Sequence, residues 1–472
     1  MHELFDDKPR EECAVIGVYN HPKAAQVAFQ GLFALQHRGQ ESSGIVSSDG
    51  NHLYKYVNLG LVSDVFSDAT IFERLKGSLA VGHNRYSTTG SSLKINVQPL
   101  VVSSKDGTMA ISHNGNFVNA HQLRTQLEAD GSLFQTTSDT EIVLHLVAKS
   151  KNRDIVSRLK EALEKVQGAY SMVIATRRKL VAIRDPYGLR PLALGQWGDC
   201  YMVASETCAF DLVGAGFIRE IEPGEILLID DNQLHSTFLE PRVSRKACIF
   251  EFIYFSRPDS FIFGHAVDKI RRKFGKVLAL EQPADADIVI SVPDSSNTAA
   301  LGYSHTSGIK FEIGLIRNHY IGRTFILPDQ SMRDFKALIK FNPVHGVIQN
   351  RRVVVVEDSI VRGTTLKQLT RMFRRAGAKE VHVRVSSPPI RFPCYYGMDF
   401  PTREELIASE HSIEEVRKFI DVESLGYLSF EGLLSAVPAE NGGFCTACFD
   451  GSYPIVPEDE ISKYHLETPI IS

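Results

Sequence analysis

The sequence lacks a long apolar run, an excess of basic residues and a secretory leader, and each absence excludes a class of protein. No stretch approaches the roughly 20 apolar residues that span a bilayer. A net charge of -4 and a pI near 6.5 argue against a dedicated nucleic-acid binder or a membrane-surface protein. The opening residues, MHELFDDKPREE, are too acidic and polar for a secretory signal. We therefore expect a cytoplasmic protein.

Cysteine is also sparse, and its pattern does not fit a disulfide framework. The seven residues are an odd number with wide, irregular spacing: Cys13, Cys200, Cys208, Cys248, Cys394, Cys445 and Cys448. In a reducing compartment such cysteines are catalytic, metal-binding or simply buried. We expect Cys200 and Cys208 to be core residues.

The composition, with 43% hydrophobic and 23% charged residues, is that of a soluble globular protein. At 472 residues the chain is too long for one ordinary core, so we expect two domains, 13–243 and 244–472. The first half mixes short β-rich runs with helical stretches such as 24–39, for which Gly39 is the expected C-cap. Strands without simple strand–helix alternation predict a layered α+β domain.

The second half has a different pattern. Its apolar runs DIVISV (287–292) and RRVVVVED (351–358) each lead through a polar turn into a helix, and VHVRVSSPP (381–389) follows as a third strand. Buried strands each followed by a helix predict an α/β domain with a mainly parallel sheet and ligands at the strand C-termini.

The strongest local signal is VVVVEDSIVRGTT (353–365). A buried strand ends in Glu357 and Asp358 and runs into a loop of small and hydroxylic residues that opens a helix. Backbone N–H groups at a helix N-terminus, with Gly363 allowing close approach, make an anion cradle. The two acids suit ribose hydroxyls or a hard cation such as Mg²⁺. The plain alternative is a capped helix after a buried strand, with two solvated acids.

This segment resembles the phosphoribosyl-diphosphate signature of type I phosphoribosyltransferases. The resemblance implies that the 5′-phosphate is held by Ser359, Ile360, Val361, Arg362, Gly363, Thr364 and Thr365. It also implies that Glu357 and Asp358 contact ribose and Mg²⁺. Ser295, in PDSSNTAA (293–300), would contact the metal or the diphosphate, although a serine-rich turn is equally plausible from the sequence alone.

Residues 323–346 resemble the mobile loop that covers the substrate in the same family. Its cations would neutralise the diphosphate leaving group; they are Arg323, Arg333, Lys336 and Lys340. Three positions depart from the family pattern: Glu357 stands where Asp is frequent, Leu338 where a second lysine is usual, and His345 where arginine is common.

Cys13 alone would be read as a core cysteine. However, LQHRGQESSGI (35–45), VGHNRYSTTG (81–90), SHNGN (112–116) and TSDTE (137–141) resemble segments of class II glutamine amidotransferases, whose fold is the layered αββα N-terminal-nucleophile hydrolase. A thiol that attacks an amide needs a base, and the α-amine of an N-terminal residue titrates near working pH. We therefore expect residues 1–12 to be a propeptide that is removed after Glu12.

The same resemblance assigns the remaining glutaminase residues. Asn114 and the Gly115 backbone N–H would form the oxyanion hole, Arg85 would bind the glutamine α-carboxylate, and Asp139 would bind its α-ammonium. The plain alternatives are a surface ion pair for Arg85, a hairpin turn for Asn114–Gly115 and a helix cap for Asp139.

FCTACFD (444–450) contains a C-x-x-C pair, which is typical of metal or redox chemistry. Together with Cys248 and Cys394, Cys445 and Cys448 match the family members that carry a [4Fe–4S] cluster, which four thiolates usually hold. A zinc ion with four cysteine ligands and a dithiol redox pair remain open, because spacing does not distinguish them.

Across residues 13–450 both halves together are similar to the iron–sulfur-containing amidophosphoribosyltransferases. The resemblance implies that ammonia from glutamine displaces diphosphate from 5-phosphoribosyl 1-diphosphate, giving 5-phosphoribosylamine at the first step of purine synthesis. It also implies a homotetramer and feedback inhibition by purine nucleotides. Two alternatives are another class II amidotransferase, such as a glucosamine-6-phosphate synthase-like enzyme, and a regulatory homologue with a decayed active site.

Overall fold

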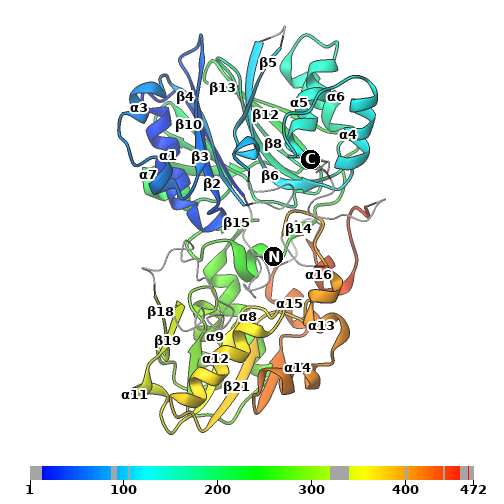
Figure 1. Cartoon of the computed structure of the whole chain (residues 1–472). Helices are drawn as coiled ribbons and strands as arrows, with labels where there is room; N and C mark the ends of the chain where they lie inside the picture. The colour runs from blue at the N-terminus through cyan, green and yellow to red at the C-terminus, as the bar shows by residue number, and fades with distance from the viewer. Residues whose placement is uncertain are drawn as a thin grey trace, which may run out of the picture.

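The structure is a computed structural model that describes residues 13–86, 93–104, 107–318, 340–398, 402–438 and 442–457, together with residue 466. Two antiparallel sheets with their helices form the first half of the chain, and a parallel sheet with its helices forms the second (Figure 1). The polypeptide passes from one architecture to the other between Phe238 and Ala247. In the part of the chain that the structure describes, no helix is both long and apolar enough to cross a membrane.

The first antiparallel sheet has the strand order β11-β9-β10-β1-β4-β2-β3. Its strands are β1 (Ala14–Tyr19), β2 (Ser42–Ser48), β3 (Leu53–Leu59), β4 (Leu79–Arg85), β9 (Ala193–Trp197), β10 (Cys200–Ala204) and β11 (Gly216–Glu220). Helices cover its outer face, namely α1 (Ala24–Ala34), α2 (Val62–Val65), α3 (Ile71–Arg74) and α7 (Cys208–Val213). Cys200 and Cys208 are buried in that layer, as expected.

The second antiparallel sheet has the order β13-β12-β8-β7-β6-β5. Its strands are β5 (Leu100–Ser104), β6 (Gly107–Phe117), β7 (Gly168–Ala175), β8 (Leu180–Arg184), β12 (Glu225–Asp230) and β13 (Gln233–Phe238). Its outer face is covered by α4 (Ala120–Ala129), α5 (Thr140–Lys149) and α6 (Ile155–Leu163). The inner faces of the two sheets meet in an apolar layer that includes Val15 and Val81 from one sheet and Val173 and Leu227 from the other. The predicted layered αββα fold is confirmed.

One local prediction in this half is only partly correct. The helix expected over 24–39 ends at Ala34 and is followed by the 3₁₀ turn η1 (Gln36–Arg38). Gly39 occupies the C-cap position of η1, and its N–H donates to the Gln36 carbonyl oxygen, but its backbone is extended, with φ −158°. A Cβ at Gly39 would lie 2.8 Å from the carbonyl carbon and oxygen of Asn84, so glycine is needed for close approach to β4.

The second half is built on a parallel sheet of order β17-β20-β21-β22. Its strands are β17 (Ile288–Ser291), β20 (Arg352–Glu357), β21 (Glu380–Val385) and β22 (Ser424–Tyr427). Val353 and Val355 face the layer of α12 (Thr364–Arg375) and α14 (Ile413–Ile420). Val354 and Val356 face the layer of α8 (Val267–Glu281), α9 (Asn297–Ser307) and α15 (Phe430–Ala436). Burial on both faces explains the uninterrupted valine run, and the predicted parallel α/β fold is confirmed.

The remaining elements are short. They are η2 (Lys94–Asn96), β14 (Ala247–Cys248), η3 (Glu251–Phe255), β15 (Phe261–Ile262), β16 (His265–Ala266), β18 (Leu315–Arg317), β19 (Phe341–Pro343), α11 (His345–Ile348), η5 (Arg403–Glu405), α13 (Ile407–Glu410), β23 (Phe444–Cys445) and α16 (Ala447–Asp450). β14 lies at the junction of the halves and pairs with β23 from the end of the chain (Figure 1).

Candidate active sites and cysteine group

Cys13 lies at the start of β1 in a buried position. Its Sγ donates to the Tyr86 carbonyl oxygen at 3.3 Å and accepts from the Tyr86 N–H at 3.5 Å. Burial raises the pKa of the thiol to about 11, although the charge of Arg85 opposes that rise. The sulfur is therefore a protonated thiol at neutral pH and needs a base before it can attack. Among the described residues, its hydrogen bonds go to the Tyr86 backbone, and no side-chain base contacts it.

Arg85 and Asp139 lie within electrostatic reach of Cys13. Arg85 ends β4, the strand that pairs with β1, and is 3% exposed. Burial lowers the pKa of the Arg85 guanidinium, while the charges of Cys13, Glu41 and Asp139 oppose the shift. A cation and an acid in a buried site suit the two ends of an amino acid, and a surface ion pair for Arg85 is excluded by its burial.

Asp139 precedes α5 but does not cap it. Its carboxylate accepts a hydrogen bond from the Phe117 N–H at 3.0 Å, and no side-chain cap bond forms. Burial would raise the pKa of Asp139, but His113 and the backbone N–H donors outweigh it and hold the pKa below its usual range. Asp139 is therefore a buried anion at neutral pH, and it lies beside the strand that carries Asn114.

Asn114 and Gly115 lie within β6, where they pair with Ser171 and Tyr170 of β7. The hairpin-turn alternative for this pair is therefore wrong. The Nδ2 atom of Asn114 is buried and has no hydrogen-bond partner in the described part of the chain. A buried amide donor without a partner is costly, so this atom is suited to an acceptor that only a ligand supplies. Gly115 has φ +143°, and a Cβ there would lie 2.0 Å from the Ala169 carbonyl oxygen.

The predicted phosphate loop connects β20 to α12. Gly363 has φ +76° and occupies the N-cap position of α12 without a side-chain cap, which leaves the helix N-terminus suited to an anion. Ile360 and Val361 are buried in the two apolar layers beside the sheet, so only their backbone groups are available to a ligand. The side chain of Arg362 pairs with Glu405, through Nη2 at 2.5 Å and Nε at 3.1 Å. Thr364 and Thr365 begin α12.

The two acids and the serine-rich turn come together at the end of β20. Glu357 and Asp358 are 4% and 1% exposed. Ser295 donates to Asp358 Oδ2 at 2.5 Å, and Ser359 donates to Oδ1 at 2.7 Å. Because Ser295 and Asp358 are 63 residues apart, the contact unites two segments that the sequence had linked only by resemblance. The solvated-acid alternative is excluded by burial.

Within the predicted covering loop, 323–346, the structure describes residues 340–346. Arg323, Arg333, Lys336 and Leu338 lie outside the described residues. Lys340 directly precedes β19, and its Nζ lies 5.9 Å from the centre of the Phe341 ring. His345 begins α11.

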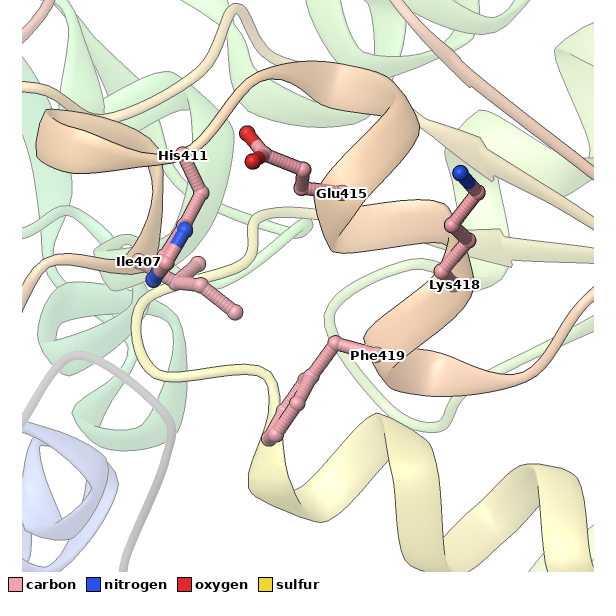
Figure 2. Close-up of a pocket in the computed structure, with 5 residues that line it drawn as sticks. All are labelled: Ile407, His411, Glu415, Lys418 and Phe419. Atoms are coloured by element: carbon pink, nitrogen blue, oxygen red, sulfur yellow. The ribbon is translucent and has the colours of Figure 1, made fainter.

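A pocket of about 420 Å³ lies on the α13–α14 side of the phosphate loop and is lined by Ile407, His411, Glu415, Lys418 and Phe419 (Figure 2). It adjoins the loop, because a Cβ at Gly363 would lie 3.2 Å from Ile407 and 3.3 Å from Phe419. None of its lining residues was predicted from the sequence.

The four cysteines of the predicted metal site gather where the two halves meet. Cys248 and Cys445 are direct partners in the parallel pairing of β14 with β23. Cys448 follows in α16, and Cys394 packs against the same apolar residues. Burial raises the pKa of Cys248 to about 11 and also raises the pKa values of Cys445 and Cys448, and the charges of neighbouring cysteines add to each rise.

The described residues include no group of three or more His, Cys, Asp or Glu side chains in a geometry that holds a metal ion. The chemistry of the donors nevertheless fits a thiophilic centre. Four free thiols are gathered from three distant segments, and each would need a positive partner to become a thiolate in this buried place.

A buried ion network that the sequence did not reveal lies between the halves. Arg38 donates from Nη1 to Glu206 Oε1 at 2.5 Å and from Nη2 to Glu251 Oε1 at 2.6 Å. All three side chains are fully buried. Arg38 Nε also donates to the Cys13 carbonyl oxygen at 3.4 Å. Glu251 of the second half is thereby linked to the residue that carries the candidate nucleophile.

Comparison with known proteins agrees with this arrangement. A family model described as the glutamine amidotransferase domain matches residues 83–211, which run from β4 to α7. The two-sheet half therefore defines a glutamine amidotransferase, here joined to a parallel sheet with a phosphate loop.

Relatives that match nearly the whole chain indicate which kind of glutamine amidotransferase this is. Amidophosphoribosyltransferase 1 of Arabidopsis thaliana is 51% identical over 96% of this chain and 80% of its own length. The amidophosphoribosyltransferase of Bacillus subtilis is 49% identical over 98% of both chains. The structure of glutamine phosphoribosylpyrophosphate amidotransferase from B. subtilis, complexed with ADP and GMP, is 47% identical with a TM-score of 0.91, and covers 96% of this chain and 100% of its own.

The chain belongs to the amidophosphoribosyltransferase family. It catalyses glutamine-dependent amidotransfer to phosphoribosyl diphosphate, the first step of purine biosynthesis. The alternatives of a different class II amidotransferase and of a decayed regulatory homologue are thereby rejected in favour of the predicted enzyme.

Proposed function

We propose that Cys13 is the glutaminase nucleophile and that its own α-amine, freed by removal of residues 1–12, is the general base. The observation that carries this proposal is the buried, protonated Cys13 thiol, which has no side-chain base in contact among the described residues. An α-amine has a pKa of about 7.7–8.0, so it can accept the thiol proton near neutral pH.

In the first half-reaction, Cys13 Sγ attacks the side-chain amide carbon of glutamine while the α-amine takes the thiol proton. The negative charge moves to the amide oxygen, where Asn114 Nδ2 and the Gly115 N–H would stabilise it. The C–N bond then breaks, and the amine returns its proton to the departing nitrogen, releasing ammonia. Water hydrolyses the resulting thioester to glutamate and restores the thiol.

Glutamine would be held at its other end by Arg85 and Asp139. The Arg85 guanidinium suits the α-carboxylate, with two parallel N–H donors. The Asp139 carboxylate, which stays ionised because its pKa is lowered, suits the α-ammonium group. Burial of both side chains strengthens these charge interactions relative to water.

In the second half-reaction, ammonia displaces diphosphate at the anomeric carbon of the ribose. Residues 359–365 would hold the 5′-phosphate at the N-terminus of α12. Glu357, Asp358 and Ser295 would face the ribose and the diphosphate and would hold Mg²⁺, which neutralises charge on the leaving group when it is bound. Arg323, Lys336 and Lys340 are proposed to assist from the covering loop. Pairing of Arg362 with Glu405 makes the loop backbone, rather than this side chain, the principal phosphate ligand.

We further propose that Cys248, Cys394, Cys445 and Cys448 hold a [4Fe–4S] cluster. Their convergence at the junction of the halves supports a structural role, since the reaction moves no electrons. The cluster would tie the start of the second half to the end of the chain.

Three further properties are proposed for this chain. ADP and GMP are present in the B. subtilis enzyme structure, and another solved structure that is 47% identical is that of the allosteric regulatory enzyme of purine biosynthesis. Inhibition by purine nucleotides is therefore proposed here. A homotetramer is proposed on the family resemblance. A cytoplasmic location is proposed from the composition and charge of the sequence and its lack of a long apolar run.

The partition into two sites is tested by Cys13→Ala. This variant should lose glutamine-dependent synthesis completely but retain synthesis from free ammonia, because Glu357 and Asp358 belong to a separate sheet. Cys200→Ala, at a buried cysteine whose thiol donates to the Tyr201 carbonyl oxygen, is the matched control. Loss of both activities in Cys13→Ala would contradict the partition. Mass spectrometry of active wild-type enzyme should give Cys13 as the first residue, and an active enzyme that retains Met1 would exclude the α-amine mechanism.

A further inference from the structure

A turn of the second half rests directly on the glutaminase strand β6. Asn116 Nδ2 donates to the Tyr395 carbonyl oxygen at 3.0 Å, although the two residues are 279 positions apart. A Cβ added at Gly397 would lie 3.1 Å from the carbonyl carbon of Gly115 and 3.2 Å from its Cα. The backbone of the Tyr395–Gly397 turn therefore packs so closely on the backbone of Gly115 that a side chain at Gly397 would require one of them to shift.

The turn is itself held firmly in place. The Tyr396 carbonyl oxygen accepts hydrogen bonds from Arg190 Nε at 3.1 Å and from Arg190 Nη2 at 2.6 Å. The Tyr396 hydroxyl donates to the Ile455 carbonyl oxygen at 2.7 Å and accepts from the Ile455 N–H at 2.9 Å. Tyr396 is 3% exposed. The turn is therefore fixed by Arg190, in the connection between β8 and β9, and by Ile455, near the end of the chain.

Gly115 has little freedom of its own and depends on its neighbours. Its φ of +143° lies in a region that L side chains rarely adopt. The Ala169 carbonyl oxygen would also lie only 2.0 Å from a Cβ at this position. The Asn114 Nδ2 atom has no partner in the described part of the chain that could hold it. The direction of the Asn114 amide is therefore set by the backbone of residues 114–116 and by the segments that pack on that backbone.

We propose that the Tyr395–Gly397 turn is a positioning element for the glutaminase reaction, which sets the direction of the Asn114 amide and the Gly115 N–H. The proposal rests on the proposed oxyanion role of those two donors. Gly397 is the positioning residue, because its φ of +105° and its close contact with the Gly115 backbone both favour glycine. Since Cys394 immediately precedes the turn, the cysteine group and the glutaminase site share one short segment.

The inference predicts a specific kinetic signature. Donors that miss the oxyanion lower the rate of the chemical step. Arg85 and Asp139, which are proposed to bind the substrate, belong to β4 and to the start of α5, and Asp139 contacts β6 at Phe117 rather than at residues 114–116. A displaced turn should therefore lower kcat for glutamine hydrolysis and leave KM for glutamine nearly unchanged.

Gly397→Ala is the direct test. The added methyl group must push against the Gly115 backbone, and we expect kcat for glutamine use to fall roughly 10- to 100-fold. Synthesis from ammonia and alkylation of Cys13 by iodoacetamide should remain at wild-type rates. Gly308→Ala is the control for backbone strain. Gly397 and Gly308 both have positive φ, +105° and +74°, but a Cβ at Gly308 meets nothing within 4 Å. Wild-type glutamine turnover in Gly397→Ala would overturn the proposal.

Asn116→Asp provides a second test that adds no volume. A carboxylate oxygen would replace the amide donor and repel the Tyr395 carbonyl, so kcat for glutamine should again fall while ammonia-dependent synthesis persists. If Gly397→Ala does not fold, wild-type glutamine turnover in Asn116→Asp overturns the proposal. Asn114→Ala separates the two levels of the argument. Unchanged glutaminase in Asn114→Ala rejects the oxyanion assignment itself, whereas its loss beside normal Gly397→Ala and Asn116→Asp enzymes rejects only the positioning role.

Discussion

Replacing Arg38 by methionine removes the central cation of the buried network and keeps most of the side-chain volume. Arg38 donates to Glu206 and to both carboxylate oxygens of Glu251, and all three side chains are fully buried. The variant leaves two carboxylates without their main partner. Glu206 keeps His37, Ser260 and the Arg257 N–H, whereas Glu251 keeps Ser256 at 2.6 Å and a more distant Arg190 at 3.7 Å.

The size of the effect can be worked out because the folded protein can neutralise an unpaired carboxylate by protonating it. Protonating one carboxyl group of ordinary pKa at pH 7 costs about 3.7 kcal/mol. This agrees with the ~3–5 kcal/mol that is lost when one partner of a buried ion pair is removed. We therefore expect Arg38→Met to lower the free energy of unfolding by about 4 kcal/mol. Removing a carboxylate as well, in Arg38→Met with Glu251→Gln, should restore a large part of that loss.

The pH dependence gives an independent check. Burial would raise the pKa of Glu206, but His37 and Arg38 hold it well below its usual range. A carboxyl group with a depressed folded pKa contributes stability above its unfolded pKa of about 4.3, and that stability disappears as pH falls through the folded value. The cost of protonating the unpaired carboxyl group falls to zero at its unfolded pKa of about 4.3. The difference between wild type and Arg38→Met should therefore be large at neutral pH and should narrow as pH falls toward about 4.3. It should narrow further below that pH, where the contribution of Glu206 is lost.

Urea unfolding followed by circular dichroism measures both quantities. Arg352→Met is the control, since Arg352 pairs with the exposed Asp285 and Asp287 and should cost at most about 1 kcal/mol. An Arg38→Met protein within 1 kcal/mol of wild type at pH 7, on the same scale as that surface control, would refute the reasoning, as would a deficit that does not change with pH.

Two further predictions concern the second half. Asp358→Asn should impair synthesis from both ammonia and glutamine, because the buried carboxylate lies beside the phosphate loop, while Asp285→Asn at an exposed position should not; normal turnover and affinity for phosphoribosyl diphosphate in Asp358→Asn would reject its assignment. Anaerobically purified enzyme should contain about four irons and four sulfides per chain, and Cys445→Ser should lower the yield of folded protein whereas Cys200→Ser should leave the iron in place. One zinc per chain would replace the cluster by a zinc site, and full activity without metal would return the cysteines to the core.

Sequence patterns predicted the fold class because burial leaves a direct mark on the chain. The valines of β20 form an unbroken apolar run since both faces of a parallel sheet are covered. The short strands of the first half do not alternate simply with helices, and this irregular order predicted a layered α+β domain. Element ends were less certain, as Gly39 illustrates. Its glycine reflects close approach to Asn84, a contact between separate segments that no local helix rule contains.

The candidate sites divide in the same way. The acids and glycine of the phosphate loop are contiguous in sequence, so their chemistry could be inferred from one segment. Arg38 lies in LQHRGQESSGI (35–45), a segment that resembles class II glutamine amidotransferases. Its partners Glu206 and Glu251, however, are 168 and 213 residues away. Nothing local distinguishes such an arginine from one on the surface. The contact of Gly397 with Gly115 was hidden for the same reason, since it involves backbone atoms of distant glycines.

Two contacts that depend on residues of the second half are made to the backbone of the glutaminase strands. Arg38, held by Glu251, donates to the carbonyl oxygen of Cys13 at the start of β1. The Tyr395–Gly397 turn packs on Gly115 in β6. Neither contact occupies a side-chain atom of Cys13 or Asn114, so both fix position without consuming a reactive group. Each contact is buried and depends on a segment that borders the cysteine group. We therefore expect a shift of the junction between the halves to displace both β1 and β6. The parallel sheet and its phosphate loop take no part in these two contacts.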